Sequence, residues 1–238
     1  MLSVAYGGDS VNETTFSEVR AEPLSEVVLR VVREAIIEGR LPPGAPINQA
    51  DLAKQLAVSR APLREALKHL ENDGLVTNVP YRGTVVTPIT RKGIEELQSF
   101  RKLMENFAAE LMLQRCTDKD FNEFDALVDE MERSAEAGNV AEMNAADVTF
   151  HSRIIELSDH QMLRMVWDSY VQQIRRALSL RNQANHDLTF LVQLHRDLVS
   201  AFRAHDLERV RLCYEAHGTD VPARLAHLFV ENNHEGSK

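Results

Sequence analysis

The chain has 238 residues, of which 44% are hydrophobic and 26% charged, a composition typical of a globular protein with one large or two modest domains. No run of about 18 uncharged apolar residues is present, so we expect no membrane span, and the polar, acidic start does not resemble a signal peptide. The two cysteines, Cys116 and Cys213, lack the spacing of a disulfide framework or a zinc ribbon. The sequence therefore predicts a protein of the reducing cytoplasm with no membrane partner.

Charge is unevenly distributed along the chain. The formal net charge is −9, which by itself argues against a nucleic-acid partner. Residues 1–22 carry one Arg against four acids, and residues 92–238 carry 17 Lys and Arg against 25 acids. Residues 23–91 carry nine Lys and Arg against seven Asp and Glu, so this segment alone has a positive net charge. The excess is small, so an interpretation as a DNA-binding segment depends on particular residues.

The first part of the chain shows three helical segments followed by two short strands. Apolar residues recur at helical spacing over residues 23–39, where a Gly- and Pro-rich stretch ends the helix. Two further helices are expected at 49–56 and 60–72, joined by a tight turn. Two β-prone runs follow at 75–79 and 84–88. This order of elements is typical of a winged helix-turn-helix.

After residue 90 the strand signals disappear. Amphipathic runs of helical spacing cover residues 91–115, 118–137, 139–158, 160–181, 186–204 and 206–231. Consecutive helices of this kind form a bundle. The predicted fold class is therefore mainly α, with an N-terminal winged helix-turn-helix and a C-terminal bundle of six to seven helices.

The pattern divides the chain into four segments. Residues 1–22 are expected to form a flexible tail, and residues 23–89 the winged helix-turn-helix domain. Residues 90–231 are expected to form the helical domain, and residues 232–238 a C-terminal tail.

The helix expected at 60–72 carries three cations on one face. Arg60, Arg64 and Lys68 recur every four residues, beside a stripe of apolar residues. Such a face can enter the major groove, where Arg bridges the O6 and N7 acceptors of guanine. We expect Arg60 and Arg64 to read bases and Lys68 to meet phosphate, with Ser59 as the N-cap. On an isolated helix a solvated basic face would be the commoner explanation, but the surrounding elements favour DNA.

The tip of the expected hairpin adds a second basic element. Arg82 and Gly83 form a flexible wing suited to the minor groove or the DNA backbone. One head of this kind makes too few base contacts for tight operator binding, and two-fold symmetry doubles them. We therefore expect a homodimer on a pseudo-palindromic, double-stranded operator.

Residues 24–88 resemble the N-terminal domain of the GntR family of bacterial regulators. The matching residues are 37–44 (IEGRLPPG), 52–53 (LA), 58–67 (VSRAPLREAL), Leu70, 73–76 (DGLV) and 82–83 (RG). The resemblance implies a transcription regulator, most often a repressor. One departure is Ala50, where relatives of the FadR type often carry an Arg that helps to read the operator, so the operator is expected to differ from theirs.

Four polar residues of the second part stand where an apolar core face is expected. Asp147 and His151 are four residues apart on one helix, and His195 and His217 fall on the apolar faces of two later helices. Burying these groups costs several kcal/mol unless they are paired or ligated. A carboxylate and three imidazoles from three helices suit a divalent transition metal. Taken singly, each His is more often a hydrogen-bonded core residue, and Asp147 with His151 is also compatible with an ordinary i,i+4 pair.

Residues 94–228 resemble the FCD domain, the FadR-type ligand-binding bundle of one large GntR subfamily. The matches are Arg101 with Glu105, Asp147 with His151, and the run from His195 through Asp206 to His217. The resemblance implies that Asp147 and the three His hold zinc, nickel or manganese. It also implies an effector that is a small carboxylate, often an organic or sugar acid, bound at the metal and by an Arg.

Arg101 and Glu105 are expected at the edge of an apolar stripe. Arg101 offers a planar fork for an effector carboxylate, and Glu105 can orient it. A purely structural Arg–Glu pair explains the spacing equally well.

Further side chains are read as structural. Arg175, Arg176 and Arg181 are interpreted as a solvated face in preference to effector contacts. Tyr170 is expected in the core or in a pocket wall, and Met165 in the core.

Two alternatives to a metal-dependent sensor remain open. The metal centre could belong to an enzyme acting on a small organic acid. We favour no catalytic role, because no Glu, Ser or Lys at a recognisable spacing supplies a general base or nucleophile. The His cluster could also contact the effector directly, without a metal.

Overall fold

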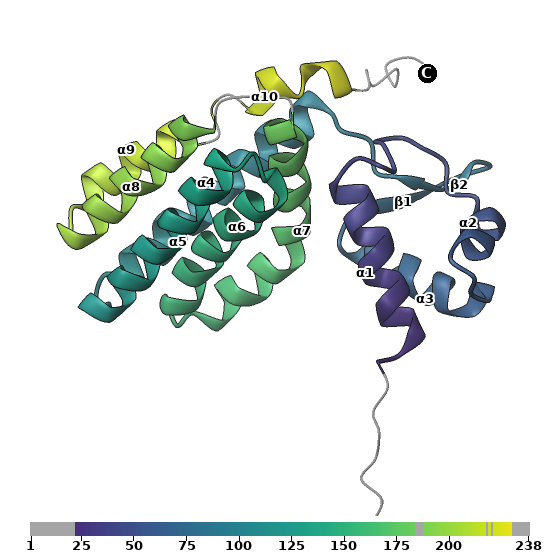
Figure 1. Cartoon of the computed structure of the whole chain (residues 1–238), viewed down its shortest axis with the longest axis horizontal. Helices are drawn as coiled ribbons and strands as arrows, with labels where there is room; N and C mark the ends of the chain where they lie inside the picture. Colours follow the sequence, from purple (N-terminus) through teal and green to yellow (C-terminus); the bar gives the residue numbers. More distant parts are fainter. Residues whose placement is uncertain (1–21, 184–187, 218, 220, 230–238) are drawn as a thin grey trace, which may run out of the picture.

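The computed structural model describes residues 22–183, 188–217, 219 and 221–229. Figure 1 shows a small N-terminal head lying to one side of a larger helical bundle. The predicted fold class is confirmed. In the described part of the chain, no helix has the length and apolar character needed to cross a membrane. The predicted tails, 1–22 and 232–238, lie outside the described residues except for Glu22.

The head is a winged helix-turn-helix. It comprises α1 (Leu24–Ile37), α2 (Gln49–Gln55), α3 (Arg60–Asn72), and the antiparallel strands β1 (Val76–Val79) and β2 (Gly83–Val86). The apolar stripe of α1 packs on that of α3, because each helix repeats Leu, Ile, Val or Ala at three- and four-residue intervals. The predicted bounds of all five elements agree with the structure to within two residues.

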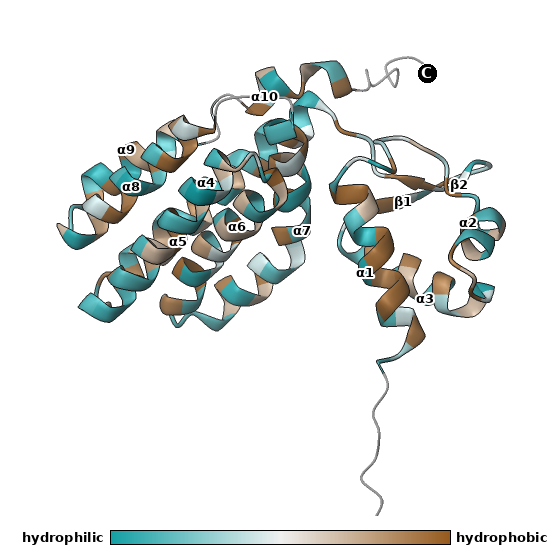
Figure 2. Ribbon diagram, in the orientation of Figure 1, coloured by the Kyte–Doolittle hydropathy of each residue, from teal (hydrophilic) through white to brown (hydrophobic). Residues whose placement is uncertain are grey.

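Six helices form the bundle. They are α4 (Arg91–Met112), α5 (Asp118–Glu136), α6 (Val140–Leu157), α7 (Gln161–Gln183), α8 (Thr189–Arg203) and α9 (Leu207–Ala216). Phe124, Phe150 and Phe202 meet at the centre, with ring centroids 4.9 Å apart for the first pair and 6.4 Å for the last two. Figure 2 shows hydrophilic and hydrophobic segments alternating along these helices, which is the amphipathic pattern expected of a bundle.

The prediction of the last helix is wrong in one respect. We expected a single helix over 206–231, but α9 ends at Ala216, and His217 adopts an extended backbone with ψ of 118°. A four-residue helix, α10 (Val221–Arg224), and a 3-10 turn, η1 (Ala226–Leu228), follow. Pro222 lacks the backbone N–H that a continuous helix needs, so it fits only the first turn of a new one. Phe229 then forms an isolated parallel bridge with Ile89, in the linker between head and bundle.

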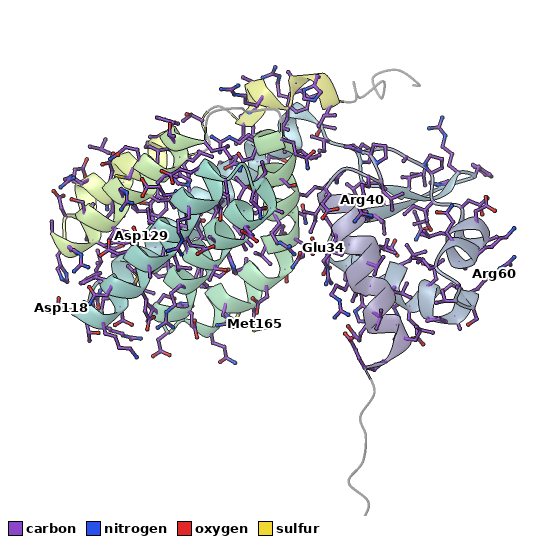
Figure 3. The ribbon with its side chains drawn as sticks, in the orientation of Figure 1. Glu34, Arg40, Arg60, Asp118, Asp129 and Met165 are labelled. Carbon is purple, nitrogen blue, oxygen red and sulfur yellow. The ribbon has the colours of Figure 1, made fainter. Side chains whose placement is uncertain are left out.

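The head contacts the bundle through α7. Arg175 forms an ion pair of 3.1 Å with Glu34, which Figure 3 shows on the side of α1 facing the bundle. Arg176 and Arg181 are buried, so their interpretation as a solvated face is wrong. The reason is that α7 is covered on one side by the bundle and on another by α1.

Two apolar predictions on α7 are also corrected. Met165, expected in the core, is 56% exposed, and Tyr170, expected in the core or a pocket wall, is 39% exposed. Both lie on the face of α7 that packs against neither α6 nor α1.

Candidate functional site

Four predicted polar residues converge inside the bundle. Asp147 and His151 come from α6, His195 comes from α8, and His217 is the C-cap residue directly after α9. Each offers a ligand atom, and these atoms all lie within 4.8 Å of one another. All four side chains are buried. The cluster therefore has the composition and compactness that can hold a metal ion.

The orientation of the imidazoles favours ligation. His195 Nδ1 donates to the carbonyl oxygen of Leu191 at 2.7 Å, which leaves Nε2 as the nitrogen with a free lone pair. His195 Nε2 lies 3.2 Å from His151 Nε2. The nearest Asp147 oxygens lie 3.6 Å from His151 Nε2 and 3.8 Å from His195 Nε2. Ligand atoms around a tetrahedral ion with bonds of about 2.0–2.1 Å are separated by about 3.3 Å, so these separations suit one ion.

The electrostatics of the cluster point the same way. Both Asp147 oxygens and His217 Nδ1 are buried without a hydrogen-bond partner among the described residues. Burial lowers the pKa of His195 to about 4 and places the pKa of His217 well below its usual value, so both rings are neutral. Neutral imidazole is the form that binds metal, and a cation would offset the cost of the unpaired carboxylate. The donor set therefore fits a divalent transition metal.

Arg101 and Glu105 lie beside the cluster on α4. Arg101 Nε donates to Glu105 Oε1 at 2.6 Å, and Glu105 Oε2 is 2.9 Å from His151 Nδ1. Burial alone would raise the pKa of Glu105, but the Arg101 guanidinium and His151 lower it to about 2. The pair is fully buried rather than at the edge of a stripe as predicted, because α6 and α9 pack over this face of α4.

Two nitrogens of the Arg101 guanidinium are available as further hydrogen-bond donors. Neither Nη1 nor Nη2 has a hydrogen-bond partner among the described residues, and Nη2 is 3.8 Å from Asp147 Oδ1. The structural Arg–Glu pair exists, and it uses only one edge of the guanidinium. The other edge faces the cluster.

The sequence did not single out Tyr214 as a functional residue. Its hydroxyl is buried and has no hydrogen-bond partner among the described residues, and its ring centroid is 6.5 Å from that of His151. The signal was its position three residues before His217, on the same face of α9. A buried phenol without a partner is costly, so this group also suits a polar ligand.

The predicted DNA-binding residues lie on an open surface of the head. Arg60, Arg64 and Lys68 are exposed along α3 and form no ion pair with any described residue. Figure 3 shows Arg60 on the side of the head that faces away from the bundle. Ser59 occupies the N-cap position, but its side chain makes no capping hydrogen bond, contrary to expectation. Its exposed hydroxyl is left free for another partner.

The hairpin between β1 and β2 carries the predicted wing. Arg82 and Gly83 are exposed at its tip, and Gly83 has φ of +75°, a conformation that favours glycine. Tyr81, which was not among the predicted contact residues, is fully exposed and has φ of +63°. An exposed aromatic ring beside Arg82 makes the tip a compact contact element.

Comparisons with known proteins agree with this architecture. The family model described as bacterial regulatory proteins, gntR family, matches residues 24–86, and the FCD domain model matches residues 96–220. The chain is 27% identical over 204 residues to the gluconate operon transcriptional repressor of Bacillus subtilis, covering 84% of each chain. It is 29% identical over 173 residues to the probable D-xylose utilization operon transcriptional repressor of Paenarthrobacter nicotinovorans, covering 73% of this chain and 76% of that one.

A solved structure supports the fold. The E. coli protein McbR/YncC superposes with a TM-score of 0.70 at 23% identity, covering 87% of this chain and 98% of that chain. At this identity the likeness shows only that the two chains fold alike.

Proposed function

The chain belongs to the GntR family of bacterial regulatory proteins and carries an FCD domain, and we propose that it is a repressor released from its operator by a small carboxylate. Its relatives are transcription regulators and not enzymes, as predicted, and DNA binding through the head follows from the family. A bacterial transcription regulator works where the chromosome is, in the cytoplasm.

One observation carries the proposed effector site. Two guanidinium nitrogens of Arg101 and both carboxylate oxygens of Asp147, none with a hydrogen-bond partner among the described residues, face each other next to three imidazoles. A divalent ion held by Asp147 and the three His would offer an effector carboxylate a Lewis-acidic position if it takes more than four ligands, as octahedrally coordinated ions do. The free edge of Arg101 would bind the same carboxylate through paired hydrogen bonds, with Glu105 holding the guanidinium in place.

The head supplies the proposed DNA contacts. Arg60 and Arg64 reach base edges in the major groove, Lys68 and Ser59 meet phosphates, and Arg82 with Gly83 contacts the neighbouring groove or backbone. Two copies bind the two halves of a pseudo-palindromic operator. Effector binding shifts the bundle towards an arrangement in which the heads no longer match the spacing of the half-sites, a coupling of typically ~1–3 kcal/mol.

The domain bounds are part of the proposal. Residues 23–89 form the DNA-binding domain and residues 90–231 the effector domain. The side chain of Thr90 accepts from the backbone N–H of Gly93 and so begins α4, which supports a boundary at this residue.

A ligand screen tests the function. Metal-loaded protein is melted in the presence of small organic and sugar acids, because a ligand that prefers the folded state raises the melting temperature. Acids that stabilise the protein are then tested for release of a labelled operator, measured by fluorescence anisotropy. If no stabilising acid changes operator affinity, the proposed regulation is wrong. Elemental analysis separates the metal-free alternative, which predicts substoichiometric metal even after loading.

Replacing Arg101 by lysine tests the effector contact. Lysine keeps a cation beside Glu105 and Asp147 but loses the planar fork. We expect the acid concentration that releases half of the operator to rise by about 10-fold or more, because one hydrogen bond between charged groups is lost. Metal content and operator affinity without acid should stay unchanged. A variant that responds to the acid like the wild type would leave Arg101 with only a structural role.

An exposed apolar face supports the homodimer. Its residues, on α4 and α7, are Phe100, Leu103, Phe107, Met162, Met165 and Tyr170. The ring centroids of Phe100 and Tyr170 are 5.4 Å apart, so the two helices present one continuous face. Contiguous exposed apolar surface often marks a protein–protein interface.

Replacing Leu103 by aspartate tests this interface. Leu103 is 67% exposed, so the change should leave the protomer folded but place a charge inside the dimer contact. We expect light scattering to report a monomer and the operator to be bound more weakly. Leu212→Asp is the matched control, because Leu212 is 60% exposed on α9, a helix that contributes none of the residues of this face. If the Leu103→Asp protein stays dimeric, the dimer interface must lie on another surface.

A further inference from the structure

A cleft of about 250 Å³ lies where the head joins the bundle. One side is formed by the end of α3 and by the linker that follows β2, and the other by the first turns of α4 and the middle of α7. Its lining residues are Gly74, Thr87, Pro88, Ile89, Thr90, Gly93, Ile94, Leu97, Gln173, Arg176 and Ala177. None of these residues is acidic, and none belongs to the metal centre.

Arg176 is a buried cation that forms no ion pair with any residue the structure describes. Its side chain is 5% exposed, and Nη2 donates to the carbonyl oxygen of Thr87 at 2.7 Å. Its Nε is buried with no hydrogen-bond partner in the described chain. Burial lowers the pKa of this guanidinium to about 10, and no carboxylate in the described part of the chain opposes that effect. Burying an unpaired cation is expensive, so such groups are normally paired or bind an anion.

Two further groups make the cleft favourable to negative charge. The 22-residue helix α4 begins at its rim, with Thr90 at the N-cap and Gly93 in the first turn. The N-terminus of a helix carries partial positive charge and free backbone N–H groups, which attract anions. The hydroxyl of Thr87 is buried, has no hydrogen-bond partner within the described ranges, and can donate a hydrogen bond into the same space.

We propose that this cleft binds a small oxyanion, a carboxylate or phosphate group, between Arg176 and the start of α4. The site is distinct from the metal centre and additional to the proposed effector site. The cleft is smaller than the ~300–1,000 Å³ typical of pockets for drug-sized ligands, so it suits an anion of few atoms. A bound anion links α7 and α4 of the bundle to the linker of the head, and therefore stiffens the joint between DNA-binding and sensing parts.

Melting curves with inorganic phosphate and with succinate test the site. The full-length protein is titrated with each anion in a zwitterionic buffer. We expect the melting temperature to rise by about 3–6 °C when the anion reaches ten times its dissociation constant. Arg176→Met should abolish this rise. Without anion the same variant should melt at or above the wild-type temperature, because an uncompensated buried charge has been removed.

Three variants keep the test specific. Arg175→Met removes the neighbouring cation, which pairs with Glu34 and does not line the cleft, so the rise should persist. Asp147→Asn alters the metal centre and should also keep the rise. Arg176→Gln retains a donor to Thr87 and serves as the second test if the methionine variant fails to fold.

The outcomes separate this site from the others. A rise that survives in both Arg176 variants places the anion elsewhere, for example on the exposed cations of α3, and overturns the proposal. A rise that is lost in Asp147→Asn but kept in Arg176→Met assigns the anion to the metal centre, which overturns this site and supports the effector site. A response to phosphate alone or to succinate alone, lost in Arg176→Met, supports the site and identifies its ligand class.

Discussion

Replacing Arg60 by alanine is expected to weaken operator binding by about 30-fold or more. A paired contact between Arg and guanine contributes ~1–3 kcal/mol of discrimination, and a homodimer loses it in both heads. The side chain is exposed at the first position of α3 and pairs with no described acid, so its removal should not affect folding. Anisotropy titrations of wild type and variant at one fixed salt concentration measure the change.

The choice of controls separates base reading from general attraction to DNA. Arg40→Ala removes an exposed Arg of the same head that pairs with Glu38 and lies away from Arg60 in Figure 3. It should change affinity little. Lys68→Ala should weaken binding to all DNA sequences alike. It should also reduce the slope of log affinity against log salt concentration by about one unit per head. If binding were insensitive to both salt and Arg60→Ala, α3 could not be the reading helix.

Removing the metal is expected to lower the melting temperature by about 8–16 °C, relative to protein in a free metal concentration about 1,000 times the dissociation constant of the site. The ion is proposed to neutralise the buried Asp147 carboxylate and to bind the imidazole nitrogens that converge on it. Asp147→Ala should remove the response of the melting temperature to added zinc, nickel or manganese. It should also abolish release by the acid while leaving operator binding without acid intact. Calorimetric melting with and without chelator, together with elemental analysis, measures these effects.

A histidine outside the cluster provides the control. His205 is exposed at the turn between α8 and α9, and its φ of +51° is tolerated well by asparagine. His205→Asn should keep full metal content and the full thermal response. If this variant lost metal while Asp147→Ala retained it, the ion would have to sit outside the proposed centre.

Local sequence patterns predicted the head well because each of its elements is short and limited by turn chemistry. The Gly- and Pro-rich stretch before α2 and the Asp-Gly pair after α3 mark where helices end. The cluster of one carboxylate and three imidazoles was also predictable, since polar residues on apolar helix faces are rare. Its assembly at one point depends on how α6, α8 and α9 pack, and periodicity alone does not specify that packing.

The errors share a physical cause. The burial of Arg101 and Arg176 could not be predicted, because an Arg on an amphipathic helix is usually solvated, and only tertiary contacts close the space around it. The break at His217 was hidden because apolar spacing continues through Val221 and Leu225, which pack against Ile89 and Ile94 instead of extending α9. Met165 shows the reverse case, an apolar residue on a face that no described element covers.

The end of α9 at His217 has a mechanical consequence. Eleven residues separate His217 from Phe229, whose backbone is bridged to Ile89. The segment between them is anchored by Val221 and Leu225 to the same apolar cluster as the linker. A displacement of the His217 imidazole would therefore be transmitted over a short distance to Ile89, in the linker that joins the DNA-binding head to the bundle.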